Sequence, residues 1–431
     1  FIFSFCGAAV TVFGVMFAPA IISWIAPGFA GSSSTLALTA FLFKFMLPYF
    51  WCILLSALFM GILNTFGNFS TPAVAPVLFN LTVISFTLLV CNRFGFGITG
   101  LAAGVAAGGL VQLLFQFNAV FRANVFSFKG VRFFHPGAAA VFTTMIPCMI
   151  GAASYQVNLM AASFFASRLA EGSVCALYYA DRMVQFPLAL FAVSTATVLL
   201  PEVAKQYSSN HTDQIAVLFT RGLNLVFFIT IPAMAGLLAL DREIIYFLFA
   251  RGAFGIDAVS QTAAALRFLV SGLWAFTGAR VFVTLYFGTA SYRIPFLSGL
   301  ASIGLNLVLC SLLIGSMGIG GLSAAVSISS AAHFLTLFLL SPGRAGIDKR
   351  EIFVSACRSV FLSGIMFLLI ELLSRYLFGF DQGKLMYGAV LSGTICAGIG
   401  IYLGLNALVP GPESKLVMKL IKKRLKKDPH D

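Results

Sequence analysis

Apolar runs long enough to cross a membrane follow one another along almost the whole chain. A span needs roughly 20 mostly apolar residues, because a helix rises about 1.5 Å per residue through a hydrocarbon core about 30 Å thick. Twelve such runs occur, near 2–26, 36–63, 73–91, 98–121, 138–167, 174–200, 218–240, 262–287, 294–314, 319–340, 353–378 and 385–410. The pattern predicts an all-α polytopic membrane protein with twelve transmembrane helices in this chain.

One segment departs from this pattern. Residues 241–255 place Ile244, Ile245, Phe247 and Leu248 between charged ends. A short amphipathic stretch of this kind is too short to cross the membrane, and it is typical of a helix that lies in the interface.

Basic residues in the loops indicate on which side of the membrane each loop lies. An even number of spans puts both ends on one side. The loops of that side carry Arg122, Lys129, Arg132, Lys205, Arg221, Arg293, Arg344, Lys349 and Arg350, and the tail adds Lys415, Lys419, Lys422, Lys423, Arg424, Lys426 and Lys427. The opposite loops carry only Arg93, Arg168, Arg242, Arg251, Arg375 and Lys384. Because cytoplasmic loops are enriched in Lys and Arg, we expect both ends to be cytoplasmic and the tail to dock on anionic lipid.

The composition excludes a soluble protein. Hydrophobic residues make up 60% of the chain and charged residues only 10%, too few to cover a water-facing surface. The net charge of +13 does not indicate nucleic-acid binding, because the basic residues lie in loops and the tail rather than on one face with stacking aromatics. The eight cysteines form no CxxC pair, and we interpret them as small buried hydrophobes rather than disulfides or zinc ligands.

An internal repeat of six spans relates the two halves of the chain. Shifts of 221 to 225 residues align Lys44 with Arg267, Trp51 with Trp274, Gly100 with Gly321 and Phe29 with Phe254. Six is even, so the copies share one orientation, and such paired bundles usually enclose a central site. We expect two pseudo-symmetric six-helix lobes; a duplicated scaffold without a transport role is the alternative. The predicted organisation is an N-terminal lobe at 1–121, a cytoplasmic linker at 122–137, a C-terminal lobe at 138–340, an extra helix pair at 341–410 and a basic cytoplasmic tail at 411–431.

The start of the chain fits this repeat. The first two spans of the second copy, 138–167 and 174–200, have no counterparts in the first copy, so we expect two more spans before Phe1 and fourteen in total. The opening run has no basic segment before it and no small-residue cleavage site, so we expect no signal peptide and read it as the interior of a longer protein.

Arg182 is the most informative charged residue inside a predicted span. It lies about nine residues, or roughly 13 Å, from the start of its helix, too deep for easy snorkelling. Tyr178, Arg182, Gln185 and Ala189 share one helical face, which suits the wall of a wet cavity. An arginine fork matches phosphate oxygens bidentately. The alternative is a structural ion pair with an acidic residue on another helix.

Other polar residues inside the spans are weaker candidates. Arg280 is a second candidate for the cavity wall, whereas Lys44 and Arg267 lie near span starts and are explained equally well by snorkelling. Glu371 can pair with Arg375 at i+4. Gln156 is a further candidate, although such polar residues, like Asn158 beside it, also join helices. No P-loop, metal-ligand spacing or cluster of titratable residues is present, so we expect no metal, no cofactor and no enzymatic chemistry.

The sequence resembles the MurJ (MviN) family of lipid II flippases. The resemblance rests on Tyr178-Tyr179-Ala180-Asp181-Arg182-Met183 with Phe186-Pro187, on Ala26-Pro27-Gly28-Phe29 and on Arg251-Gly252-Ala253-Phe254, and it covers nearly the whole chain. It implies a fourteen-helix fold of the multidrug/oligosaccharidyl-lipid/polysaccharide exporter type, with Arg182 engaging the lipid diphosphate. It also implies that the last two spans form a groove for the polyprenyl tail, and that further cavity arginines precede this chain.

The resemblance implies flipping of lipid II across the bacterial inner membrane by alternating access. The expected partners are lipid II and membrane lipids, with other cell-wall synthesis proteins as candidates. The rival functions are export of drugs or of another polyprenyl-linked glycan, an enzyme acting on lipid-linked sugars, and a cell-wall scaffold. The chain departs from some members at a sodium site, where Ala162 replaces an aspartate and Cys310 a second ligand while Asn306 is kept, and in the loop Ser291 to Pro295. These departures put sodium coupling in doubt.

Overall fold

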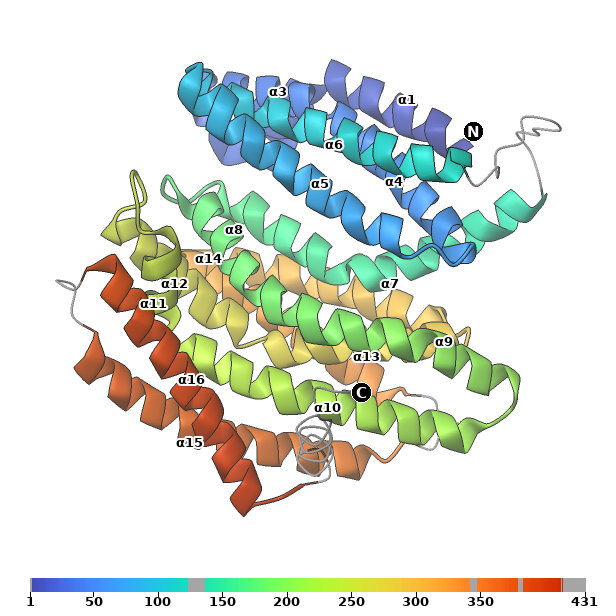
Figure 1. Cartoon of the computed structure of the whole chain (residues 1–431), viewed down its shortest axis with the longest axis vertical. Helices are drawn as coiled ribbons and strands as arrows, with labels where there is room; N and C mark the ends of the chain where they lie inside the picture. Colours follow the sequence, from blue (N-terminus) through green and yellow to red (C-terminus); the bar gives the residue numbers. More distant parts are fainter. Residues whose placement is uncertain (1, 123–135, 342–346, 379–382, 412, 414–431) are drawn as a thin grey trace, which may run out of the picture. The chain divides into compact units, whose positions relative to one another are not determined.

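The chain is helical throughout the part that the structure describes. The computed structural model covers residues 2–122, 136–341, 347–378, 383–411 and 413, and among them every regular element is a helix (Figure 1). The predicted all-α class is therefore confirmed for these residues. The chain divides into two compact units, Phe1–Val141 and Phe142–Asp431.

The first unit is built from helices, and prolines lie at several of the breaks between them. Its elements are α1 (Ile2–Met16), α2 (Ala18–Ile25), the short 3-10 helix η1 (Pro27–Gly31), α3 (Ser33–Met46), α4 (Pro48–Thr65), α5 (Ser70–Phe86), the π-helical turn η2 (Thr87–Arg93) and α6 (Gly97–Arg122). The axes of α1 and α2 are bent by 82°. Pro19, in the first turn of α2, has no N–H to continue the ladder from α1. The predicted span over 2–26 therefore corresponds to two helices joined at a sharp bend.

Glycines on α6 bring it close to α5. Gly104 and Gly108 lie one helical turn apart, so they face the same neighbour. A Cβ at Gly104 would lie 2.7 Å from Cβ of Phe86, and one at Gly108 would lie 2.8 Å from the ring of Phe79. Membrane helices lack a hydrophobic driving force toward one another, so close backbone packing through small residues stabilises such pairs.

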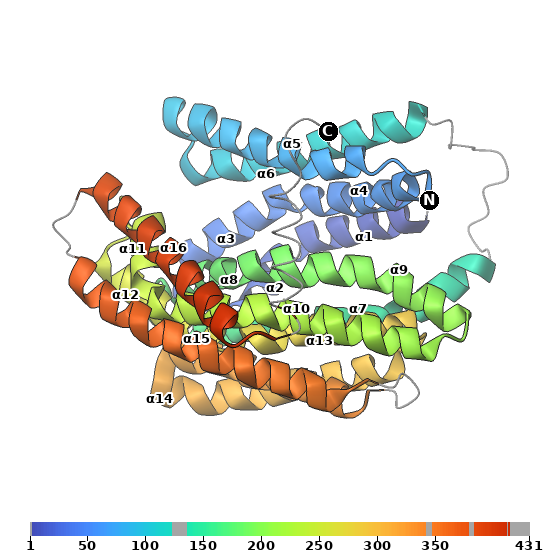
Figure 2. The ribbon, with the colours of Figure 1, turned by 60° about the horizontal axis from the view of Figure 1, so that its bottom comes forward.

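The second unit contains the remaining helices (Figures 1 and 2). They are α7 (Pro136–Ala166), which begins just before the boundary, α8 (Ser173–Pro187), the π-helical turn η3 (Leu188–Val193), α9 (Ser194–Ser208), α10 (Thr212–Ala239), α11 (Asp241–Phe249), α12 (Ile256–Val270), α13 (Leu273–Gly288), α14 (Arg293–Leu339), α15 (Lys349–Leu377) and α16 (Lys384–Leu408). The predicted amphipathic segment 241–255 contains the separate helix α11, which buries Ile245.

The element α14 covers two predicted spans. Its 47 residues would reach roughly 70 Å as one straight helix, more than twice the hydrocarbon thickness. Gly318 interrupts it with φ 53° and ψ −130°, a conformation that side chains other than glycine rarely adopt. Across this break Ser302 donates a hydrogen bond to the carbonyl of Ser329 at 2.9 Å, so the two halves lie against each other as a hairpin.

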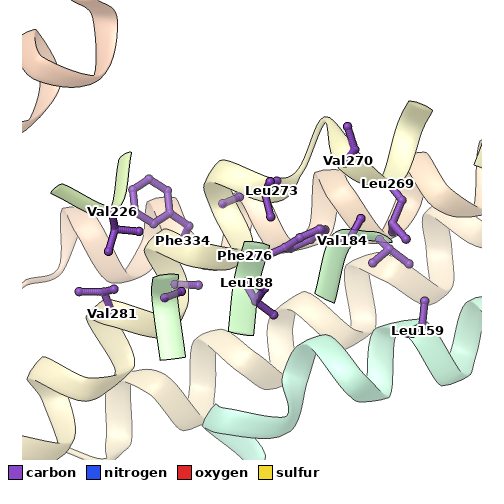
Figure 3. Packing of buried hydrophobic residues seen from close by; sticks show 14 of the residues in the cluster. Leu159, Val184, Leu188, Val226, Leu269, Val270, Leu273, Phe276, Val281 and Phe334 are labelled. Carbon is purple, nitrogen blue, oxygen red and sulfur yellow. The ribbon is translucent and has the colours of Figure 1, made fainter. Parts of the chain in front are cut away.

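The core of the second unit lies where α8, α12, α13 and α14 meet. Figure 3 shows Val184 and Leu188 close to Phe276 and Leu273 within this cluster. All four side chains are at most 8% exposed. The core therefore fixes α8, the helix that carries Arg182, against α12, and the following turn η3 (Leu188–Val193) against α13.

The helix α15 has one face for packing and another that stays open. Ser355, Ser359 and Ser363 recur every four residues on the buried face, and α15 packs along α10 through it. On the open face, Phe361 and Leu368 are each 67% exposed. Such large apolar side chains suit a lipid-facing surface, since a water-soluble protein would rarely expose a stripe of them.

Most predicted spans correspond to long apolar helices. Among the described residues, eight helices are long and apolar enough to cross a membrane, or up to ten if each bent pair counts as one span. The second bent pair, α12 and α13, has an angle of 47° between its helices, so the predicted span 262–287 is also broken. The chain is therefore a polytopic membrane protein, while the count of twelve stays a prediction.

The order of elements matches the sequence repeat. A shift of 223 carries the bounds of α3 and α4, 33–46 and 48–65, onto 256–269 and 271–288, which are close to α12 and α13. The same shift carries the start of α5 to Arg293, where α14 begins. The repeated residues therefore occupy matching positions in matching elements.

The cysteines differ from the prediction. Seven of them have described side chains, all free, and Cys6, Cys175, Cys357 and Cys396 are exposed. The expectation of uniformly buried cysteines is therefore wrong for these four. A small apolar residue need not be buried in this protein, because the surface around the spans is itself apolar.

Labelling of single cysteines tests the predicted topology. In a full-length protein cleared of its exposed native cysteines, Lys349→Cys should react only with a reagent that enters the cytoplasm, because the basic loops lie inside. Arg168→Cys, in an opposite loop, is the matched control and should react with an impermeant reagent added outside. Labelling of Lys349→Cys from outside would contradict the topology. The companion position Lys129 lies outside the described residues.

Candidate functional site

The helix α8 presents Arg182 on an open face. Arg182 lies nine residues after Ser173, the first residue of α8, and its side chain is exposed. Its guanidinium carbon lies 4.5 Å from the ring centre of Tyr178, one turn earlier, which is 52% exposed. This cation–π contact holds the guanidinium of Arg182 over the face of the tyrosine ring. The N–H groups at the edge of the guanidinium can therefore still donate to an anion.

Arg182 forms no ion pair with another described residue. The ion pairs in the described part of the chain are Arg267–Asp241, Arg358–Glu413 and Arg375–Glu371. The structural ion pair considered as the alternative role of Arg182 is therefore absent there. The pairing of Glu371 with Arg375 at 3.0 Å is confirmed, and Arg267 pairs with Asp241 at 2.7 Å instead of only snorkelling.

Next to Arg182, the carboxylate of Asp181 points into the protein. Asp181 is 5% exposed. The hydroxyl of Tyr155, on α7, donates to its Oδ1 at 2.6 Å, and Nε2 of Gln185 donates to the same oxygen at 3.4 Å. The two neighbours in sequence thus face different surroundings, as the roughly 100° turn per residue of a helix requires.

A cavity of about 410 Å³ lies within the second unit. Three sequence-predicted residues line it together: Gln156 from α7, Gln185 from α8 and Arg280 from α13. Its other lining residues are Gly151, Ala152, Ser154, Tyr155, Leu188, Val193, Ala196, Thr197, Leu200, Phe276, Ala279, Val283, Thr284, Phe287, Ser330 and His333. Arg182 and Tyr178 are not among them, although they share a helical face with Gln185 one turn away.

Sequence reasoning missed several residues of this site. Tyr155 follows the buried Ser154 and precedes the predicted Gln156, and its ring packs edge-on against Phe276 at 4.6 Å. His333, on α14, is 4% exposed and lines the cavity. Their positions depend on which helices adjoin, which no spacing within one helix reveals. Arg280 itself is exposed and is the one arginine among the lining residues.

The residues at the position that the resemblance relates to a sodium site form a neutral network. Nδ2 of Asn306 donates to the carbonyl of Asn158 at 2.9 Å, and Sγ of Cys310 lies 3.7 Å from Oδ1 of Asn306. Nδ2 of Asn158 donates to Ser302 at 3.0 Å, and Ala162 is fully buried beside these helices. The network contains no carboxylate, and carboxylates are the preferred protein ligands of hard cations.

We expect transport to be independent of sodium through this position, because Ala162 and Cys310 cannot supply hard oxygen ligands. Replacing sodium by choline at constant ionic strength should leave the transport rate of the full-length protein unchanged. A sodium ion bonded to Asn306 in a high-resolution map, together with a lower rate in choline, would overturn this expectation.

Comparison with known proteins places the sequence among lipid flippases. Residues 1–388 match the family model described as "Lipid II flippase MurJ". A Vibrio cholerae serotype O1 relative named "Probable lipid II flippase MurJ" is 32% identical over 409 residues, which cover 94% of this chain and 76% of the relative. A relative of the same name from Buchnera aphidicola subsp. Acyrthosiphon pisum is 31% identical over 334 residues, which cover 78% of this chain and 65% of the relative.

Solved structures share the fold. A structure described as "Lipid II flippase MurJ, inward closed conformation" superposes with a TM-score of 0.75 at 23% identity, covering 94% of this chain and 81% of that one. An inward-facing multidrug resistance MATE family transporter of the MOP superfamily superposes with a TM-score of 0.65 at 16% identity, covering 80% and 79%. At these identities the superpositions show a common architecture alone.

Proposed function

Because the chain belongs to the lipid II flippase MurJ family, we propose that it moves lipid II, the polyprenyl-diphosphate-linked disaccharide peptide, from the inner to the outer leaflet of the bacterial inner membrane. The family resemblance predicted from the tyrosine-tyrosine-alanine-aspartate-arginine motif is confirmed. The protein is accordingly a transporter in peptidoglycan biosynthesis and not an enzyme.

The proposed mechanism is alternating access by a protein of fourteen spans, twelve of them in this chain. Two six-helix lobes would rock about a central site, and α15 and α16 would form the extra pair. The correspondence of α3 and α4 with α12 and α13 supports the duplicated lobes. No bond of the substrate is made or broken, so the site only has to bind the headgroup and release it on the other side.

The observation that carries the proposal is an arginine inside a span without an ion pair among the described residues. An unpaired charge there costs roughly 2.5–3.5 kcal/mol on insertion scales, so its retention needs a functional reason. A diphosphate supplies one, because its oxygens accept parallel hydrogen bonds from the guanidinium fork. Gln185, Gln156 and Arg280 add polar groups that would bind the sugars and phosphates of the same headgroup. The lipid tail would stay in the bilayer.

Reconstitution with different substrates tests this function. We expect the full-length protein in liposomes to translocate lipid II, with the mass of the lipid unchanged, as mass spectrometry would show. Parallel vesicles with another polyprenyl-diphosphate glycan or a cationic drug test the exporter function that the MATE-like fold also permits. Translocation of these compounds without lipid II would overturn the proposal, and cleavage of the lipid would indicate an enzyme.

A further inference from the structure

Asp181 is a buried carboxylate inside a span, and it forms no ion pair with a described residue. Its side chain belongs to the tightly packed face of α8, with 5% of the residue exposed. The guanidinium next to it in sequence, on Arg182, lies over the ring of Tyr178. Burying an ionised carboxylate without a cation is costly, and such residues in membrane proteins often carry protons.

The hydrogen bonds of Asp181 leave room for a proton. Both of its described bonds, from Tyr155 at 2.6 Å and from Gln185 at 3.4 Å, end on Oδ1. Within the described residues, Oδ2 has no partner and can bind a proton without breaking either bond. The site therefore accommodates the carboxylate and the neutral acid in one geometry.

The hydrogen-bond partners of Asp181 connect its carboxylate to the cavity. Tyr155 and Gln185 both line the cavity, so the two partners of Asp181 form part of its wall. Arg280 of α13 also lines this cavity and adds a positive charge to its wall.

Among the described residues, few other titratable groups lie around this site. They are Tyr155 on α7, Arg182 on α8 itself, Arg280 on α13 and His333 on α14. The helix α12, which packs against α8, carries Asp257 in its first turn and Arg267, which forms an ion pair with Asp241. Of these, His333 is the group whose protonation has to be distinguished from that of Asp181, so the test includes a variant of it.

We propose that Asp181 is a proton-binding site whose charge controls the affinity of the cavity for an anionic headgroup. The inference rests on the proposed function, because the anion is the diphosphate of the substrate. An ionised Asp181 partly cancels the field of Arg182 and Arg280, whereas the protonated acid leaves that field intact. Anion binding therefore favours the protonated form, and by linkage a headgroup that binds takes up a proton.

The test measures lipid II binding and proton uptake together, with full-length protein in lipid nanodiscs between about pH 5.5 and 8.5, the range in which a shifted carboxylate or a histidine changes charge. A diphosphate diester stays fully ionised in this range, so the ligand contributes no phosphate titration. We expect the affinity for lipid II to fall by up to about tenfold per pH unit above the pH at which Asp181 loses its proton. Binding of lipid II should be accompanied by uptake of up to about one proton. Asp181→Asn keeps the acceptor for Tyr155. This variant should bind lipid II at every pH with the affinity that the wild type reaches at acid pH, and it should take up no proton.

Two controls assign the effect to Asp181. Glu202 on α9 resembles Asp181 in that it accepts a hydrogen bond from a glutamine one turn later, Gln206, at 2.8 Å. Glu202 does not line the cavity, so Glu202→Gln should leave the pH dependence of binding unchanged. His333→Gln removes the other titratable candidate and should also preserve the pH dependence. Loss of the dependence in His333→Gln, with retention in Asp181→Asn, would overturn the proposal.

A second variant covers the case in which Asp181→Asn does not fold. Tyr155→Phe removes the 2.6 Å hydrogen bond to the carboxylate but keeps the ring that packs on Phe276. Since that bond stabilises the ionised form, its loss should move the pH dependence of binding to higher pH. An unchanged midpoint would contradict the proposal. Absence of lipid II binding at every pH in the wild type would instead contradict the proposed function, so the two failures are distinct.

Discussion

Arg182→Ala abolishes lipid II flipping by the full-length protein and leaves it folded and inserted; this is the largest effect on activity that we expect. The charge has no ion pair to lose within the described residues, so its removal strands no buried carboxylate. Arg182→Lys keeps the charge but loses the bidentate fork, and should flip roughly tenfold more slowly, the loss expected of one charge-assisted hydrogen bond.

Flipping rate, expression and melting temperature should be measured on the same preparations. Arg168→Ala is the matched control, because Arg168 also lies over an aromatic ring, that of Phe164 at 4.9 Å, but it belongs to the connection between α7 and α8 and not to α8 itself. It should flip at the wild-type rate. A structural role for Arg182 would instead lower the melting temperature of Arg182→Ala by several degrees, corresponding to a few kcal/mol. Normal flipping by a well-expressed Arg182→Ala protein would remove this residue from the mechanism.

Gly278→Leu should have the largest effect on stability. Gly278 lies where α13 meets α14 and α10, and a Cβ there would lie 2.5 Å from the ring of Phe334 and 3.2 Å from that of Phe227. Phe334 cannot retreat easily, because its ring also packs edge-on against Trp274 at 5.4 Å. Overpacking a dense interior costs about 1–3 kcal/mol even for small additions, so we expect a loss of roughly 3 kcal/mol or more.

The loss should show as lower expression and a lower melting temperature in detergent. Gly236→Leu is the matched control, since a Cβ at Gly236 on α10 meets no atom within 4 Å. Equal melting temperatures for the two variants would contradict the packing described for α13.

The helices could be predicted closely because the bilayer imposes both their length and their composition. The expected spans 98–121 and 385–410 agree with α6 and α16 to within two residues at each end. The breaks in 2–26 and 262–287 could not be predicted in the same way, because hydropathy measures the composition of a segment and not the direction of its axis. Pro19 is a local signal of the first bend only.

The candidate site was predictable only within single helices. Helical spacing places Tyr178 and Arg182 on one face, and the two side chains are in contact. The same spacing turns Asp181 away, but it cannot identify Tyr155 on α7 as the partner of that carboxylate. Tyr155 and Asp181 are 26 residues apart and lie on different helices. Their contact depends on how the helices pack, and no local pattern in the sequence shows this packing.

The leaflet distribution of lipid II after depletion of the full-length protein from growing cells tests the central claim most directly. A membrane-impermeant reagent that modifies the headgroup measures the share of lipid II in the outer leaflet. The account predicts that lipid II accumulates in the inner leaflet, protected from the reagent, while its total amount rises. An undiminished outer-leaflet share under full depletion would contradict the claim that this protein flips lipid II.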